Sequence, residues 1–234
     1  MTAGAAPVTR RRVGILISGG GSNMAALIAA AQDPAYPAEI VCVISNRADA
    51  GGLAKARAAG VPHVVVVDHK HHPDRESFER AVQAELEAAQ VELVALAGFM
   101  RLLTPWFIER WHDRLINIHP ALLPSYKGLH THARALADGV KIAGCTVHFV
   151  RPEMDVGPII VQAAVPVLDD DTPDTLAARV LTQEHRIYPL ALARVATGAA
   201  TVVRDGEGNE VVRTNRSSAS EAALIAPMRN HADT

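Results

Sequence analysis

Three side chains that are far apart in the sequence have the types needed for acyl transfer: Asn117, His119 and Asp155. Asn117 and His119 close a short apolar run. Because positions i and i+2 of an extended chain project to the same side, the amide and the imidazole would point together. An amide donor can stabilise an oxyanion, and an imidazole can move a proton. Taken alone, an Asn-x-His pair is more typical of a turn and a solvated surface, so the rest of the sequence must decide.

Asp155 lies in a stiff connector just before Val156, Gly157 and Pro158. There it would orient His119, or favour the charged imidazolium, since a nearby carboxylate stabilises that form. The alternative is an ordinary turn aspartate, which is common in such loops.

A second candidate site is the loop 18–23, Ser-Gly-Gly-Gly-Ser-Asn, which follows a strand-length apolar run and precedes a helix-forming segment. Strand, glycine loop and helix start present backbone N–H groups to a phosphate. The loop is not a dinucleotide fingerprint, because the next strand ends in Ser-Asn-Arg (45–47) and not in an acidic residue. It is not a Walker loop either, because no Gly-Lys-Ser/Thr follows. A loop that merely turns tightly is the alternative.

Apolar periodicity predicts the elements that must hold these residues. We expect buried strands over 13–17, 39–45, 63–67 and 91–99, and helices over 24–31, 50–59, 74–90 and 172–197. Strands that alternate with helices indicate a parallel sheet with right-handed crossovers. Ligands of such sheets bind beyond the carboxyl ends of the strands. The glycine loop, Gly98 and the Asn117/His119 pair all fall at such ends, which favours a functional role for each.

The second half of the chain is expected to add antiparallel strands. The runs 142–150 and 159–167 are joined by a connector short enough for a hairpin, and 201–204 and 210–213 form a further exposed hairpin. The predicted fold is therefore α/β, with a mostly parallel twisted sheet flanked by helices, a Rossmann-like N-terminal half and antiparallel strands in the C-terminal half. We expect one domain over 1–216 and a flexible polar tail over 217–234.

Composition narrows the function classes. The 234 residues carry a formal net charge of −2 and only 4% aromatic side chains, which argues against nucleic acid and anionic membranes as partners. No run has the length of a membrane span, and the N-terminus lacks the order of a secretory signal. Cys42 and Cys145 sit in apolar runs, as reduced thiols of a cytoplasmic protein do. The three-histidine loop 68–73 lacks supporting ligands, so we expect a solvated loop and no metal.

Seven segments, taken together and in order, resemble the phosphoribosylglycinamide formyltransferases, a folate-dependent family. The segments are Gly-Gly-Gly-Ser-Asn (19–23), Leu-Ala-Gly-Phe-Met-Arg (96–101), Asn-Ile-His-Pro-Ala-Leu-Leu-Pro (117–124), Gly-Leu-His-Thr-His (128–132), Thr-Val-His-Phe-Val (146–150), Asp-Val-Gly-Pro-Ile (155–159) and Thr-Gln-Glu-His (182–185). The resemblance covers roughly residues 13–200. It implies a formyltransferase fold with a phosphate-binding half over 13–110 and a folate-binding and catalytic half over 111–200.

The resemblance also implies an activity and its site. The formyl group of 10-formyltetrahydrofolate would pass to the glycine amine of 5′-phosphoribosylglycinamide, the third step of purine synthesis. Asn117, His119 and Asp155 would be catalytic. The substrate would be bound by Gly21, Ser22, Asn23, Gly98 and Glu184. The folate would be bound by Arg75, Met100, Arg101, Leu102, Leu103, Asn117, Val150, Arg151, Pro152, Glu153, Met154 and Asp155. From the residues alone, Arg75 is equally suited to a surface pair with Glu79 at i+4.

Departures from the family pattern are small: Ala121 stands where a serine is usual, Thr146 replaces a serine but keeps the hydroxyl, and Val156 replaces a small residue. Related enzymes share the Asn-x-His and Asp signatures. The tRNA formyltransferase has a long C-terminal domain and the deformylase an N-terminal regulatory-type domain, neither of which we expect here. A deformylase, another folate-dependent formyltransferase and a non-catalytic folate or nucleotide sensor are the alternatives. The expected partners are small-molecule substrates, with a homodimer as the candidate assembly.

Overall fold

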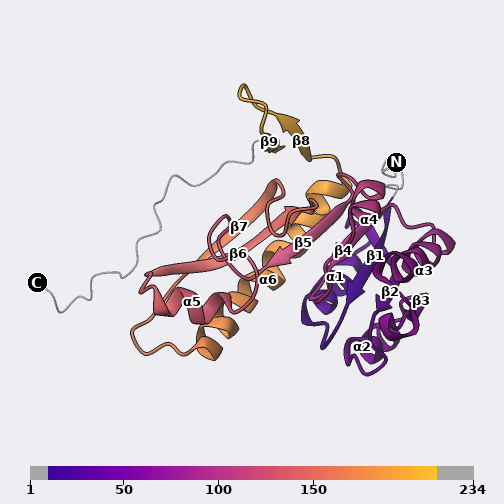
Figure 1. The fold of residues 1–234 in the computed structure, drawn as a ribbon, viewed down its shortest axis with the longest axis horizontal. Coiled ribbons are helices and arrows are strands. Elements are labelled where there is room, and N and C mark those ends of the chain that lie inside the picture. Colours follow the sequence, from indigo (N-terminus) through magenta and orange to yellow (C-terminus); the bar gives the residue numbers. More distant parts are fainter. Residues whose placement is uncertain (1–9, 215–234) are drawn as a thin grey trace, which may run out of the picture.

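A computed structural model of the protein describes residues 10–214. Its centre is a seven-stranded sheet with strand order β3-β2-β1-β4-β5-β6-β7 (Figure 1). The first five strands in this order run parallel, β6 is antiparallel to β5, and β7 is antiparallel to β6. The bounds are β1 Arg11–Ile17, β2 Ala38–Ser45, β3 His63–Val66, β4 Leu93–Leu96, β5 Leu115–His119, β6 Ile142–Phe149 and β7 Ile159–Pro166. The α/β prediction is confirmed, although β4 is shorter than the predicted strand 91–99.

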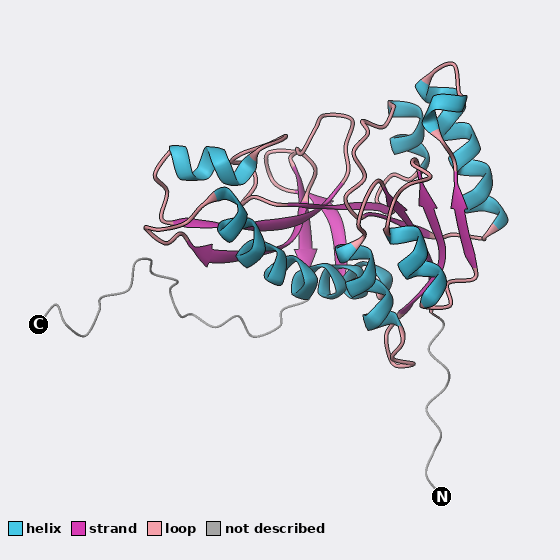
Figure 2. Cartoon of the chain, turned by 90° about the horizontal axis from the view of Figure 1, so that it is seen from below, coloured by secondary structure: helices cyan, strands magenta, loops and turns pink. Residues whose placement is uncertain are grey.

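Helices cover the sheet in two layers (Figure 2). One core cluster joins α1, α2 and α6 to side chains such as Ile15 and Val43. A second cluster joins α3 and α4 to the opposite side chains, such as Leu16 and Ile44. Consecutive strand residues thus point into opposite apolar layers, as expected for strands that are buried on both faces of the sheet. The helix bounds are α1 Ser22–Ala31, α2 Gly52–Ala58, η1 His69–His71, α3 Arg75–Ala88, α4 Pro105–Arg110, α5 Thr131–Ala137 and α6 Pro173–Ala196.

Local signals in the sequence fix where the two longest helices begin. Asp74 accepts a hydrogen bond from the Ser77 N–H at 2.7 Å and closes a capping box at the start of α3. Thr172 and Thr175 form the corresponding box at α6. Helix α6 continues through Pro189.

Tyr188 of α6 lies under the centre of the sheet and is fully buried. Its hydroxyl donates to the Leu96 carbonyl at 2.9 Å and approaches the Ile116 carbonyl at 3.4 Å. The ladder between β4 and β5 ends at the pair Leu96–Asn117. Tyr188 therefore contacts the two strands near the place where their pairing stops and where ligands of such sheets bind.

A small antiparallel hairpin, β8 (Ala200–Arg204) and β9 (Glu210–Thr214), follows α6 and projects from the main body (Figure 1). This agrees with the predicted hairpin. The expected tail 217–234 lies outside the described residues. Within residues 10–214, no helix combines the length and apolar character that crossing a membrane would need.

Candidate active site

The polar cluster around β5 and β6 follows from strand register. Asn117 faces His148 across the antiparallel pair, and His119 faces Thr146. The Asn117 Nδ2 atom lies 3.2 Å from the His148 Nε2 atom. The buried Thr146 hydroxyl donates to the Ala121 carbonyl at 2.7 Å and accepts from the Leu123 N–H at 3.0 Å. Thr146 thus holds the loop after β5 through main-chain groups, so the alanine at position 121 does not leave the loop without an anchor.

His119 is buried and both of its ring nitrogens face oxygen acceptors. The Nε2 atom lies 2.9 Å from the Tyr126 carbonyl, which can only accept, so Nε2 carries a proton. The Nδ1 atom lies 3.4 Å from Asp155 Oδ2. An imidazolium would satisfy both contacts at once. In this conformation, a bound acyl oxygen would receive the Nε2 proton only after the Tyr126 carbonyl moves away.

Asp155 is placed by its own backbone and by a neighbouring loop. Its φ is +55°, an uncommon conformation for a residue other than glycine. The Gly128 N–H donates to Asp155 Oδ2 at 2.8 Å. The carboxylate lies beside two imidazoles, with Oδ1 3.8 Å from His148 Nε2. The three residues selected from the sequence, Asn117, His119 and Asp155, therefore meet in one cluster.

His148 completes this cluster, and sequence reasoning had not selected it. Its Nδ1 lies 2.9 Å from the Phe149 carbonyl and must donate to it, which leaves Nε2 as an acceptor for the Asn117 amide. Burial lowers the pKa of His148, against the Phe149 hydrogen bond and the Asp155 charge. A neutral His148 thus orients Asn117. Its place in the strand opposite Asn117 was the signal that could have revealed it.

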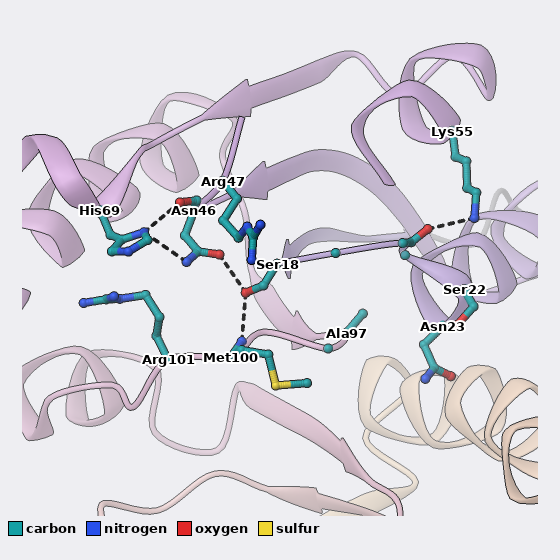
Figure 3. A pocket seen from close by; sticks show the side chains of 14 residues that line it. Ser18, Ser22, Asn23, Asn46, Arg47, Lys55, His69, Ala97, Met100 and Arg101 are labelled. Carbon is teal, nitrogen blue, oxygen red and sulfur yellow. Dashed lines mark hydrogen bonds between the residues drawn. The ribbon is translucent and has the colours of Figure 1, made fainter. Parts of the chain in front are cut away.

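A cavity of about 480 Å³ opens next to the glycine loop (Figure 3). It is lined by Gly21, Ser22 and Asn23 of the loop and by Gly98, Met100 and Arg101, which follow β4. Gly21 precedes α1 with φ +66°, and α1 has no acidic residue in its first turn. Backbone N–H groups at a helix start attract anions. Ser18, Gly19 and Gly20 of the predicted loop also line the cavity. It is lined further by residues that had not been selected as site residues from the sequence: Asn46, Arg47, Lys55, His69 and Ala97.

Ser18, just after β1, joins the segments that follow β2 and β4, and it lines this cavity (Figure 3). Its hydroxyl donates to Asn46 Oδ1 at 2.6 Å and accepts from the Met100 N–H at 2.8 Å. His69 Nδ1 donates to the Asn46 carbonyl at 2.9 Å. The expectation that the three-histidine loop is simply solvated is therefore wrong for His69. Asn46 and His69 follow predicted strands, so the rule that sites gather at strand ends could have identified both.

Asn23 and Glu184 connect the glycine loop to α6. The Asn23 Nδ2 donates to Glu184 Oε2 at 2.6 Å, and both side chains are buried. Burial raises the pKa of Glu184, and the Asn23 hydrogen bond together with the charges of His185 and His119 opposes that rise. Among the residues described, the Asn23 Oδ1 atom is one of three buried side-chain polar atoms that lack a hydrogen-bond partner. An unused acceptor next to a carboxylate suits an N–H donor.

The residues predicted for the folate separate into two groups. Met100, Leu102 and Met154 are 72%, 59% and 53% exposed, which leaves apolar surface beside the cluster. Arg101 also lines the cavity, with its guanidinium carbon 5.3 Å from the centre of the Phe78 ring. Leu103 and Val150 instead pack against the second core cluster. Pro152 and Glu153 are exposed in the connector between β6 and β7.

Two arginines predicted for the folate differ in what they contact. Arg75 opens α3 and is exposed, and its charge lowers the pKa of Glu79 against the larger effect of burial. Glu79 itself accepts from the Thr104 N–H at 2.7 Å. Arg151 is held by two carboxylates and donates to Asp113 and Glu210, each at 2.6 Å. Its guanidinium is thus already engaged within the protein.

Among residues 10–214 there is no group of three or more His, Cys, Asp or Glu side chains arranged to hold a metal ion.

A family comparison identifies the class of protein. Residues 11–192 match the model of the formyl transferase family. The match covers most of the chain and includes both the glycine loop and the Asn117 cluster. The chain therefore belongs to the formyl transferase family.

Comparison with individual proteins narrows this class. The phosphoribosylglycinamide formyltransferase of Escherichia coli is 46% identical over 185 residues, which cover 79% of this chain and 86% of that protein. A crystal structure of the Brucella melitensis phosphoribosylglycinamide formyltransferase is 58% identical, with a TM-score of 0.77, over 81% of this chain and 97% of that one. Within its family the chain belongs to the phosphoribosylglycinamide formyltransferases.

Longer relatives contain the same region. The trifunctional purine biosynthetic protein adenosine-3 of Gallus gallus is 50% identical over 196 residues, which are 84% of this chain but only 19% of that protein. The chain thus spans about a fifth of the length of this curated relative.

Proposed function

We propose that the protein transfers the formyl group of 10-formyltetrahydrofolate to the glycine amine of 5′-phosphoribosylglycinamide, a step of purine biosynthesis. The observation that carries this proposal is the single cluster in which His119 Nδ1 approaches Asp155 Oδ2 at 3.4 Å and Asn117 is oriented by His148 at 3.2 Å. The family to which the chain belongs supports it.

The phosphorylated substrate lies with its phosphate on the backbone N–H groups of Gly21, Ser22 and Asn23, where the start of α1 favours negative charge. Gly98 leaves room for the substrate beside the end of β4. The glycinamide end reaches Glu184 and the unpartnered Asn23 Oδ1, which accept its N–H groups.

The folate lies against the exposed apolar side chains of Met100, Leu102 and Met154, between the loop after β4 and the connector 150–158. Arg101 and Arg75 supply positive charge for its acidic tail. The backbone of Val150 to Asp155 forms the other wall, while the Arg151 side chain supports that wall from behind.

The amine attacks the formyl carbon directly, and the carbonyl oxygen becomes an oxyanion. Asn117 donates one amide hydrogen to His148 and keeps the other for this oxyanion. The His119 imidazolium, held at Nδ1 by Asp155, contributes its Nε2 proton once the Tyr126 carbonyl has moved aside. Collapse of the intermediate breaks the bond from carbon to the folate nitrogen, and a proton from the amine replaces the formyl group there. No covalent formyl-enzyme and no metal take part.

The test is an assay with 10-formyltetrahydrofolate and phosphoribosylglycinamide that follows release of tetrahydrofolate. Parallel reactions with water alone and with an amino-sugar nucleotide identify the acceptor. Turnover that needs the glycinamide supports the proposal. Equal release of tetrahydrofolate without any amine would favour a deformylase, and binding of both ligands without turnover would favour a sensor. A chelator should leave the rate unchanged.

The proposed setting is the cytoplasm, in agreement with two buried free thiols, Cys42 and Cys145. We propose that 13–110 form the phosphate-binding half and 111–200 the folate-binding and catalytic half of one domain. We also propose that the C-terminal hairpin, expected over 201–216, supports the second half; residues 215 and 216 lie outside the described residues. Assembly as a homodimer stays a prediction, which light scattering at defined concentrations would check.

A further inference from the structure

Residues 150–158 form the connector that carries Asp155 into the catalytic cluster. This connector is held both at its base and at its tip. At its base, the Phe149 N–H donates to the Pro158 carbonyl at 2.9 Å. A Cβ atom added to Gly157 would lie 1.7 Å from the Phe149 carbonyl oxygen, so the two limbs meet with no room for a side chain. At its tip, Asp155 is held by the Gly128 N–H.

Arg151 attaches the connector at a third point, through contacts with residues outside the catalytic cluster. Its Nε donates to Glu210 Oε2 at 2.6 Å and one terminal nitrogen donates to Asp113 Oδ1 at 2.6 Å, while the other reaches the Val150 carbonyl at 3.1 Å. Only 12% of the Arg151 side chain is exposed. Burial opposes the charge of Arg151, but its hydrogen bonds to Glu210 and Asp113 outweigh this effect and raise its pKa.

The two carboxylates are not equivalent. Asp113 is 42% exposed, whereas Glu210 is 25% exposed and therefore less screened by water. Glu210 begins β9 and lies opposite Arg204 in the hairpin, with Arg204 more distant at 3.9 Å. No residue of this hairpin lines the cavity or the catalytic cluster. Val202 and Val212 of the hairpin pack on the main core, and the ion pair with Arg151 is its polar link to the connector.

We propose that Glu210 is a positioning residue for the formyl transfer, which holds Arg151 and thereby fixes the connector that sets Asp155 beside His119. The inference rests on the proposed function. With glutamine at 210, Arg151 would keep its ionic contact only with the exposed Asp113 and would have a weaker, neutral hydrogen bond at 210, so it would turn towards water. The limb between Phe149 and Asp155 would then gain freedom. Small displacements of a catalytic group are costly, so the loss should appear in turnover.

The experiment compares Glu210→Gln with Glu207→Gln, a matched change at the exposed tip of the same hairpin. We expect Glu210→Gln to lower kcat by about 10-fold, within the range seen when supporting residues misplace a reacting group. The KM for phosphoribosylglycinamide should stay near the wild-type value, since the glycine loop is untouched. Glu207→Gln should behave as wild type. Thermal unfolding and the fraction of active enzyme are measured for each variant.

A double-mutant cycle shows whether the effect passes through Arg151. If the pair acts as one unit, Arg151→Met and Arg151→Met/Glu210→Gln should lose turnover to the same extent. Additive losses would overturn the inference. So would a kcat of Glu210→Gln within twofold of Glu207→Gln, or a loss fully explained by a smaller fraction of folded enzyme. Absence of turnover in the wild type would instead contradict the formyl transfer, and this inference with it.

Discussion

The two halves of the site hold polar groups by different means. In the glycine-loop half, main-chain groups at strand ends face an open cavity of about 480 Å³, and Ser18 joins three strands beneath it. In the catalytic half, His119, Thr146 and His148 on β5 and β6 are buried, and the half-buried Asn117 contacts His148 across the strand pair. The first arrangement suits a charged ligand that must enter and leave. The second suits groups that must not move during a reaction.

The comparison teaches that the same sheet supports binding and chemistry through different kinds of contact. Backbone donors tolerate changes of nearby side chains, because their direction is set by the helix start. A cluster of side chains depends on each member. Substitutions in the catalytic half should therefore reduce kcat, whereas in the glycine-loop half only a substitution that repels or blocks the phosphate should raise KM.

The largest effect is expected from Asn117→Ala and His119→Ala. Each removes a proposed donor to the oxyanion, and loss of such a donor typically lowers kcat by about 10²–10³-fold. Initial rates of tetrahydrofolate release give the value, and circular dichroism checks that the fold survives. A kcat near the wild-type value in either variant would remove that residue from the catalytic group.

Ser22→Asp should affect binding of the phosphorylated substrate. A carboxylate at the start of α1 would repel the phosphate. At a separation of a few ångströms in a partly solvated site, the repulsion energy is large enough to raise KM by about 10-fold or more. Ser22→Ala is the matched control and should change KM little, because backbone groups carry the contact. Steady-state kinetics at constant folate give both values. An unchanged KM in Ser22→Asp would move the phosphate away from this loop.

His148→Phe tests the orientation of Asn117 without touching a group that contacts substrate. Loss of a hydrogen bond worth about 1 kcal/mol should lower kcat roughly 5- to 10-fold. His148→Gln keeps an acceptor and should lose less. If both variants are equally impaired, with unchanged thermal unfolding, the Asn117–His148 contact does not orient the amide.

The smallest effect concerns stability at Glu184. Burial raises the pKa of this carboxyl despite the Asn23 hydrogen bond and nearby His charges. A carboxyl with a raised folded-state pKa gives its full contribution to stability below its unfolded pKa, and that contribution is lost as pH rises through the folded value. Glu184→Gln should therefore raise the Tm by a few degrees near about pH 8 and give no gain near about pH 4. Equal shifts at both pH values would mean that the buried charge costs nothing.

The ends of β1, β2 and β3 could be predicted from the sequence, because apolar runs and the loops that interrupt them are local signals, whereas β4 ends at Leu96 and not at residue 99. The i and i+2 spacing put Asn117 and His119 on β5, and the antiparallel partner strand was also expected. The contacts of Asp155 are different. Asp155 depends on the N–H of Gly128, a loop residue with φ +80°, and the neighbouring Tyr126, with φ +55°, presents its carbonyl to His119. Local sequence does not specify which main-chain group such a loop presents.

Ion pairs between residues far apart in the chain could not be predicted from the sequence either. Arg151 was assigned to the folate, whereas its guanidinium is bound to Asp113 and Glu210. Charged side chains on two loops and a hairpin carry no periodic signal that would join them. Glu184 and Asn23 meet for a similar reason: α6 crosses beneath the sheet, and its position there follows from packing of the whole core.

The hydroxyl of Tyr188 determines where α6 lies along its axis as it passes beneath the sheet. Tyr188 and Glu184 are four positions apart on α6, hence on the same face of the helix. The hydroxyl contacts carbonyls of two neighbouring strands. A shift of α6 along its axis by a fraction of its pitch of about 5.4 Å would therefore break these contacts. Tyr188 thereby fixes the axial position of α6, and with it the position of Glu184, one turn earlier, beside the glycine loop. Anyone transplanting this acid into another scaffold should carry the tyrosine and both strand carbonyls with it.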